Sequence, residues 1–268
     1  MIELNYAINT IFFLISGAMV MWMAAGFTAL EAGSVRTKNV TEILTKNVAL
    51  FSVASIAFLF LGYRLMYGWN EPDTHSMYAD FFFQMVFVAT AMSVVSGAVA
   101  ERKKLWSFLI FAAIFSSVIY PLEGAWTWGG GFLSKLGFFD FAGSGIVHMA
   151  GAAAALASVI MIGARDGKYD KNGKPQNIPG SNMPLVALGT LILWLGWFFF
   201  NGGSQLAFST IDDAKALGKI FVNTNMAAAG GLLGAMIVSK LWTKKVILNV
   251  TLNGALAGLV VITADPHS

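Results

Sequence analysis

The 268-residue chain is strongly apolar: hydrophobic side chains make up 57% of it and charged ones 12%, against about 25% charged residues in a typical globular domain. This composition excludes an ordinary soluble domain, a disordered chain and a collagen-like repeat. The sequence contains no cysteine, which excludes disulfides, thiolate metal sites and cysteine catalysis. With three histidines we expect no His-rich metal centre, and we expect no cofactor.

Eight apolar stretches come close to the ~20 residues that a membrane-crossing helix needs. In chain order they are 7–32, 42–67, 80–100, 105–124, 141–163, 184–204, 219–240 and 247–263. Small residues recur in these stretches, which suits close helix packing in lipid, and the small-residue runs 151–157 and 227–235 predict tight helix contacts. The alternating segments of a membrane β-barrel are not found in the sequence. The sequence therefore predicts an all-α polytopic membrane protein.

The positions of the Lys and Arg residues predict its orientation. Most of the 17 such residues belong to the first, third, fifth and seventh loops and the adjoining helix ends: Arg36, Lys38, Lys46, Arg102, Lys103, Lys104, Arg165, Lys168, Lys171, Lys174, Lys240, Lys244 and Lys245. Cytoplasmic loops are rich in Lys and Arg, so we expect these loops to face the cytoplasm. We therefore expect a multi-pass protein of the cell (inner) membrane whose N-terminus lies on the outer side. Since the basic residues form no single patch or stripe, we expect no nucleic-acid partner.

The fifth span carries polar residues, which are costly inside a membrane and so indicate function. Asp140 opens this span, where a carboxylate can cap the free N–H groups of a helix and also serve a nearby cation. Ser144 and His148 follow at i+4 and i+8 on one broad face, which places His148 near mid-membrane. His148 is either a satisfied core residue or part of a proton or substrate pathway, because a neutral imidazole offers both a donor and an acceptor.

Aromatic residues gather at the expected outer ends of three spans. Phe83 and Phe87 are four residues apart on the third span, Trp128 follows the fourth, and Phe200 and Ser204 are four apart at the end of the sixth. A tryptophan there is either an aromatic-belt anchor or a cation-binding face, worth ~2 kcal/mol or more when desolvated. The serine would add a hydrogen-bond acceptor. Acidic residues expected in the outer loops could attract cations: Glu71, Asp73, Asp80, Asp212 and Asp213.

Motifs along nearly the whole chain resemble the ammonium transporter (Amt/Rh) family, on its Amt side. They are Leu-Glu-Ala-Gly-Ser-Val-Arg-Thr-Lys-Asn at 30–39, Ser-Gly-Ala-Val-Ala-Glu-Arg at 96–102, Trp-Gly-Gly-Gly at 128–131, Asp-Phe-Ala-Gly-Ser-Gly-Ile-Val-His at 140–148, Gly-Trp-Phe-Phe-Phe-Asn-Gly-Gly-Ser at 196–204, Phe-Val-Asn-Thr at 221–224 and Asn-Gly-Ala-Leu-Ala-Gly-Leu-Val at 253–260. The resemblance implies an eleven-helix fold of two five-helix inverted repeats plus a final helix, assembled as a homotrimer with one pore per subunit.

Within that fold, residues 1–268 would form a single, incomplete ammonium transporter-like membrane domain. Residues 1–163 would be the first repeat, and 184–263 the first three helices of the second. The family's second pore histidine lies on the tenth helix. We therefore expect the chain to be a fragment of a longer gene product.

The resemblance also implies roles for individual residues at the outer mouth. Trp128, Ser204 and Phe87 would form the ammonium-recruitment site, and Phe87 with Phe200 would form a stacked gate below it. Phe83 is a weaker candidate for the vestibule.

Deeper in the membrane, the resemblance makes His148 the first of the family's paired pore histidines, with Trp197 lining the pore nearby. Asp140 would support the site from behind without touching the substrate. The implied function is transport of ammonium or ammonia through a hydrophobic pore after recruitment and deprotonation of the cation. The family's PII-type nitrogen-signalling proteins suggest a cytoplasmic partner, for which loop 164–183 is a candidate docking site; that loop is otherwise a solvated, turn-rich connection.

Three other classes of function remain as alternatives. A sensor or receptor could use the same fold to bind ammonium and report it. A membrane scaffold would show no substrate-dependent flux. An intramembrane enzyme would need a second acid, base or metal ligand near His148. The only candidates close to it in the sequence are Asp140 and Ser144, and the chain has no His-Glu-x-x-His pattern. We therefore expect no enzymatic activity.

Overall fold

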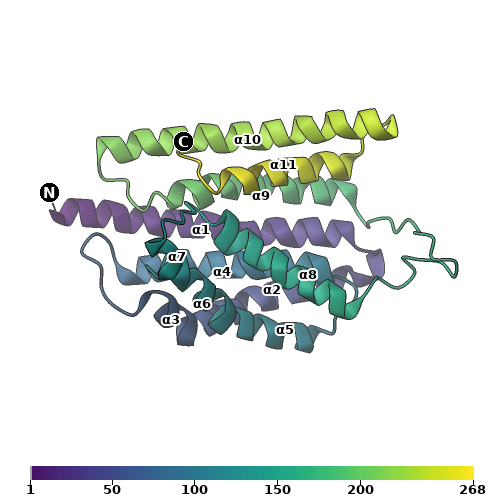
Figure 1. Ribbon diagram of the computed structural model, residues 1–268, viewed down its shortest axis with the longest axis horizontal. Coiled ribbons are helices and arrows are strands. Elements are labelled where there is room, and N and C mark those ends of the chain that lie inside the picture. The colour runs from purple at the N-terminus through teal and green to yellow at the C-terminus, as the bar shows by residue number, and fades with distance from the viewer. Residues whose placement is uncertain (1) are drawn as a thin grey trace.

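The computed structural model describes residues 2–268 as a bundle of long helices. Within this range the one element of β structure is an isolated bridge between Tyr169 and Pro175. The helices are α1 (Ile2–Ser34), η1 (Thr37–Asn39), α2 (Val40–Ala57), η2 (Phe58–Gly62), α3 (Tyr63–Tyr67), α4 (Met77–Val99), α5 (Leu105–Ile114), η3 (Phe115–Ile119), α6 (Tyr120–Thr127), α7 (Phe132–Lys135), η4 (Ser144–Met149), α8 (Ala150–Ile162), α9 (Met183–Gly203), α10 (Ile211–Thr243) and α11 (Leu248–Ile262). Figure 1 shows the long helices running side by side. The prediction of an all-α polytopic membrane protein is confirmed.

Seven helical segments of residues 2–268 are long and apolar enough to cross a membrane, and they match the first seven predicted spans. The eighth predicted span is apolar, but its helix α11 has only 15 residues, or ~22 Å at 1.5 Å per residue, less than the ~30 Å hydrocarbon core. Helix α10 begins at Ile211, upstream of the predicted start at 219, because Thr210 and Asp213 form a capping box. Polar capping residues start this helix before its apolar stretch begins.

The centre of the bundle is α4, the most thoroughly buried of the candidate spans. Glycines allow the closest helix approaches: a Cβ on Gly151 of α8 would lie 2.6 Å from the Ala91 carbonyl of α4, and one on Gly231 of α10 would lie 2.2 Å from the Gly254 carbonyl of α11. Both predicted small-residue contacts are therefore present. In the first of them, however, Ala153 and Ala157 remain exposed.

Three of the basic loops meet at one end of the bundle through Glu101, whose side chain is fully buried. Its carboxylate accepts hydrogen bonds from the Arg36 backbone N–H at 2.8 Å, from Arg36 Nε at 3.1 Å and from Asn39 Nδ2 at 2.6 Å, and it pairs with Arg165 at 3.5 Å. Burial alone would raise the pKa of Glu101, but the hydrogen bonds from Arg36 and Asn39 hold that pKa below its usual value. The loops predicted to share one side of the membrane are thus physically joined.

Lys46 departs from its predicted place beside the first loop. It is buried within α2, where its Nζ pairs with Glu31 of α1 at 3.1 Å and donates to the Ser96 carbonyl of α4 at 3.0 Å. A buried charge needs such a partner. Lys46 therefore links three helices and does not contribute to the loop charge that sets orientation.

Candidate functional site

A cavity of about 560 Å³ opens among α4, the end of α6, the segment before η4 and the end of α9. Its lining includes Phe83, Phe87, Trp128 and Ser204. The three residues expected to form the outer recruitment site, with Phe83, thus line one cavity although they come from separate parts of the chain. Asp140 also belongs to this lining.

Two phenylalanines lie between this cavity and the interior. The rings of Phe87 and Phe200 are stacked, with centroids 4.1 Å apart and planes at 22°, and both residues are almost completely buried. The Trp128 ring meets the Phe87 ring edge-on, with centroids 6.1 Å apart, and the centroid of the Phe83 ring lies 4.7 Å from that of Phe87. Phe200 also contacts His148, with ring centroids 5.5 Å apart. The order is therefore cavity, Phe87, Phe200, histidine.

His148 sits on η4, a π-helical turn that follows Gly143 in the left-handed conformation (φ 99°). The Gly143 carbonyl accepts from the His148 backbone N–H at 3.1 Å and pairs with Nδ1 at 3.0 Å. A carbonyl oxygen can only accept, so Nδ1 carries the proton and Nε2 keeps its lone pair. Within residues 2–268, Nε2 is buried and has no hydrogen-bond partner.

Asp140 has the capping contacts expected of it. Its Oδ1 accepts from the backbone N–H groups of Gly143 and Ser144, and its Oδ2 from those of Gly145 and Ile146, all at 2.8–3.1 Å. Its own backbone carbonyl accepts the indole N–H of Trp128 at 2.8 Å. One residue therefore fixes both the start of η4 and the orientation of the cavity tryptophan.

Trp197 stacks on His148, with centroids 5.0 Å apart and planes at 17°. Its indole N–H donates to Thr263 Oγ1 at 2.7 Å, the Thr263 hydroxyl lies 3.0 Å from Asn201 Oδ1, and Asn201 Nδ2 donates to Thr224 Oγ1 at 3.0 Å. The sequence analysis assigned no role to Thr263, Asn201 or Thr224. Asn201 and Thr224 stand in the quoted motifs, but no local pattern shows that their side chains meet across α9 and α10 or reach the end of α11.

The sequence analysis also did not predict the polar contacts of Asp80 and His75 at this cavity. Asp80, expected as an outer-loop charge, lies in the first turn of α4 and lines the cavity. It accepts from Tyr63 at 2.5 Å and from Gln84 at 3.1 Å. His75, on the loop before α4, stacks on Phe13 at 4.3 Å, and its burial lowers its pKa below the usual value.

The sequence matches one family model and several curated proteins, and all of them are ammonium transporters. Residues 11–267 match the model of the Ammonium Transporter Family. The chain is 43% identical to ammonium transporter Amt2 of Archaeoglobus fulgidus over 281 residues, covering 96% of this chain and 59% of that protein. It is 38% identical to ammonium transporter Amt1 of Methanocaldococcus jannaschii, over 95% of this chain and 65% of that protein. The chain thus spans about three fifths of the length of these relatives.

Solved structures agree on the fold. A sensor Amt protein superposes with a TM-score of 0.94 at 36% identity, covering 100% of this chain and 70% of that one. The crystal structure of Mep2 from Candida albicans superposes with a TM-score of 0.87 at 28% identity, covering 99% of this chain and 62% of that one. By its sequence and its helical architecture, the chain belongs to the ammonium transporter family.

Proposed function

We propose that the chain forms the recruitment site, gate and first pore histidine of a transporter that moves ammonium across a membrane as ammonia. The single observation that carries this proposal is the stacked Phe87–Phe200 pair, which separates a cavity containing Trp128 and Ser204 from the buried Nε2 of His148.

Recruitment of the cation would take place in the outer cavity. The face of Trp128 offers a cation–π contact that grows stronger as water is removed. The Ser204 hydroxyl donates its proton to the Phe200 carbonyl at 2.9 Å, which leaves the lone pairs of the oxygen free to accept an N–H of ammonium. Together these groups would replace part of the hydration of the ion.

Passage beyond the gate favours the neutral species. Moving a bare cation into a low-dielectric interior is very costly, and a group with a detachable proton avoids that cost by neutralising. Ammonium can release a proton, and potassium cannot. Nε2 of His148, held as an acceptor by the Nδ1 contact with Gly143, would receive the N–H of the molecule that has passed the rings. The proton released from ammonium would stay on the outer side or cross separately from ammonia. Only this exchangeable N–H bond is broken, so we assign no enzymatic activity.

Asp140 would act as a positioning residue, because its carboxylate is already occupied by four backbone N–H groups. Trp197 would line the path beside His148 and keep the imidazole plane fixed by stacking.

The test is uptake of methylammonium and ammonium-dependent current in a cell without its own ammonium transporters. We would compare the 268-residue chain with a chimera continued by the remaining segment of the Archaeoglobus relative. Each form is made with His148→Ala and, as a matched control, with His267→Ala, which changes an exposed histidine near the end of the chain.

We expect flux from the chimera, its loss or change in ion preference with His148→Ala, and no effect of His267→Ala. Unchanged flux in a folded His148→Ala protein would remove this histidine from the path. Flux from the 268-residue chain alone would mean that its own helices complete the pore.

A sensor is the second candidate function, because one of the similar structures is described as a sensor Amt protein. The same recruitment site would serve a sensor. Saturable ammonium binding to the chimera in the absence of any flux would support the sensor over the transporter.

The assembly and placement of the protein are further parts of this proposal. Residues 1–163 and 184–263 would belong to two inverted repeats, and the protein would form a homotrimer in the inner membrane, which the mass of the detergent-solubilised complex tests. The exposed loop 164–183 contains Lys168, Lys171 and Lys174 and would dock a trimeric PII-type regulator. Loss of regulator binding on deletion of residues 168–175 is the expected result.

A further inference from the structure

One carboxylate of the outer cavity has no part in the gate. Asp80 lies in the first turn of α4 and lines the cavity together with Trp128 and Ser204. A carboxylate near a helix start commonly accepts the free backbone N–H groups there. At the start of α4 this role belongs to Glu71, whose Oε1 accepts the Met77 N–H at 3.1 Å. The hydrogen bonds of Asp80 come from side chains instead, so its carboxylate does not serve as the cap of the helix.

Side chains of α3 and α4 hold this carboxylate in place. Tyr63 donates to its Oδ2 at 2.5 Å, and Gln84 Nε2 donates to its Oδ1 at 3.1 Å. Tyr67 donates to Gln84 Oε1 at 3.0 Å, which keeps the amide nitrogen of Gln84 turned toward Asp80. Each carboxylate oxygen thus accepts one bond, whereas a carboxylate offers about four acceptor positions. The group is oriented and still has room for further ligands.

The negative charge of Asp80 has no partner in the protein. Among residues 2–268 no ion pair includes Asp80, and no lysine or arginine of these residues lines the cavity. His75 lines it too, but burial lowers the pKa of this imidazole, so that it is mainly neutral at pH 7. The other carboxylate of the lining, Asp140, is occupied by four backbone N–H groups. A half-buried charge without a partner is costly, and a bound cation would offset that cost.

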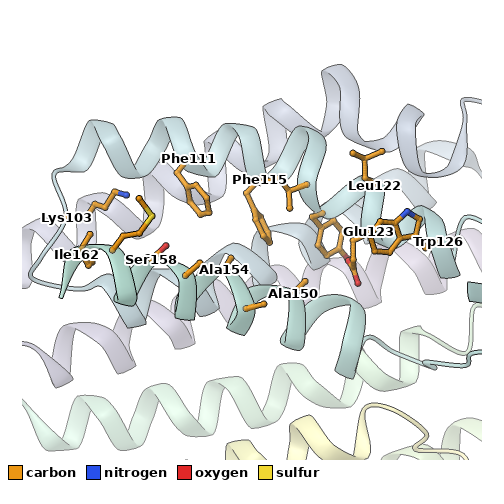
Figure 2. Close-up of a pocket in the computed structure, with 15 residues that line it drawn as sticks. Lys103, Phe111, Phe115, Leu122, Glu123, Trp126, Ala150, Ala154, Ser158 and Ile162 are labelled. Atoms are coloured by element: carbon orange, nitrogen blue, oxygen red, sulfur yellow. The ribbon is translucent and has the colours of Figure 1, made fainter. Parts of the chain in front are cut away.

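A further carboxylate of this region faces a different space. Glu123 of α6 lines a groove between the α5–η3–α6 segment and α8, where it lies beside Trp126 (Figure 2). It does not belong to the lining of the outer cavity. The unbalanced charge of that cavity therefore comes from Asp80.

Asp80 precedes the gate along α4. Asp80, Phe83 and Phe87 are spaced at i, i+3 and i+7, which places them on one face of the helix, and all three line the cavity. Seven residues of helix rise ~10 Å. A cation at Asp80 would therefore lie about two helical turns before Phe87, on the side of the cavity away from the gate.

We propose that the Asp80 carboxylate binds a monovalent cation in a first subsite of this cavity, before the cation reaches Trp128. The subsite accepts alkali cations as well as ammonium, because a carboxylate supplies charge and oxygen ligands and does not require a detachable proton. It concentrates cations and leaves their selection to the groups that follow. Its place in a transport path rests on the proposed function, whereas the binding of a cation at Asp80 does not.

The test is calorimetric titration of the detergent-purified chimera with rubidium chloride and with methylammonium chloride. The ionic strength is held constant with N-methylglucamine chloride, and the melting temperature of each variant is measured as well. Asp80→Asn removes the charge and keeps the size of the side chain. Asp73→Asn is the matched control, since it removes an exposed acidic charge from the adjoining loop, outside the cavity lining. Tyr63→Phe removes one bond to Asp80 and leaves the charge.

We expect rubidium to compete with methylammonium for the parent protein. Asp80→Asn should weaken the binding of both cations at least about tenfold, as expected for the loss of a bond to a charged group. Asp73→Asn should bind both cations as the parent does, and Tyr63→Phe should retain most of the affinity. In cells, Asp80→Asn should raise the half-saturation concentration for methylammonium uptake and leave the maximal rate unchanged.

Other results would overturn the proposal. A lack of competition by rubidium in the parent would do so without any variant. Equal losses in Asp80→Asn and Asp73→Asn would mean that diffuse charge of the outer loops attracts the cation. If Tyr63→Phe loses binding and melting temperature as fully as Asp80→Asn, Asp80 only holds α3 to α4. A chimera that moves no methylammonium would contradict the proposed transport, while weaker rubidium binding in Asp80→Asn would still support the subsite.

Discussion

At the scale of single residues, Trp128 combines two different contacts. Its indole N–H is committed to the Asp140 carbonyl, while its ring lines the outer cavity beside Phe87. The first contact fixes the plane of the ring, and the second leaves the ring available to a cation. An aromatic-belt anchor needs neither of these contacts, so substitution distinguishes the two interpretations of this residue.

Trp128→Leu should raise the half-saturation concentration for methylammonium uptake roughly thirtyfold and weaken discrimination against other cations, since a desolvated cation–π contact is worth about 2 kcal/mol. The matched control is Trp126→Leu, which changes an exposed tryptophan outside this cavity. If half-saturation and ion preference are the same in both variants and the parent, Trp128 is an interfacial anchor.

At the scale of elements, the π-helical turn η4 decides where His148 lies. Its wider turn is closed by the backbone hydrogen bond from the His148 N–H to the Gly143 carbonyl, and such turns often occur at functional sites. The turn needs glycine at its start, because Gly143 has a φ of 99° and a Cβ there would lie 2.6 Å from Val147 and 2.9 Å from the Trp128 ring.

Gly143→Ala should therefore destabilise the protein by about 1–2 kcal/mol, the cost of a left-handed non-glycine residue, and should also reduce uptake by displacing Trp128. Gly218→Ala is the control, because nothing lies within 4 Å of that position in α10. Melting temperature and uptake are measured together. Full activity in Gly143→Ala would show that the geometry of this turn is not needed.

The loop contacts at Glu101 predict a pH dependence of stability. Since the folded-state pKa of Glu101 is depressed, its contribution is present above the unfolded pKa of about 4.3 and is lost as the pH falls through the lower folded-state pKa. Glu101→Gln should cost on the order of 2 kcal/mol at pH 7, as expected for a hydrogen bond to a charged group, and should flatten the loss of stability between pH 5 and about pH 3.

Thermal unfolding in detergent from pH 7 to pH 3 measures this effect. Glu3→Gln, at an exposed glutamate, is the control and should follow the parent curve. An unchanged pH profile in Glu101→Gln would mean that the loop ends are held together by other contacts.

At the scale of the whole molecule, the joined basic loops and the turn between α10 and α11 lie at the end of the bundle away from the N-terminus (Figure 1). This arrangement supports the predicted orientation, in which that end faces the cytoplasm. Because the chain has no cysteine, single cysteines can report the exposure of each side without background.

Asp73→Cys, on the loop before α4, should react with a membrane-impermeant maleimide in intact cells, whereas Lys171→Cys should react only after permeabilisation. Both residues are exposed in the structure, so a difference reports the side of the membrane and not burial. The cysteine-free parent is the blank, and the opposite pattern would reverse the orientation.

The sequence by itself determined the fold class, the first seven spans and the gathering of the basic loops at one end of the bundle. These properties follow from local hydropathy and charge, which act on each segment separately in a membrane. It also predicted the cap at Asp140, because capping joins residues only a few positions apart. For Trp128 and His148 the residue pattern left a structural and a functional interpretation open; the resemblance favoured the functional one, with Ser204 beside Trp128, and these roles remain proposals.

Only the tertiary structure decided which distant groups meet. The contact of Trp197 with Thr263 and the burial of Lys46 against Glu31 join residues from different helices. The stacking of Phe87 on Phe200 was implied by the resemblance, and the structure supplies its geometry. Helical periodicity reports which face of a helix is apolar, but the partner of each side chain depends on how the helices are arranged. The π-helical turn at His148 was also beyond the sequence, since it depends on the packing that Gly143 allows against Val147 and Trp128.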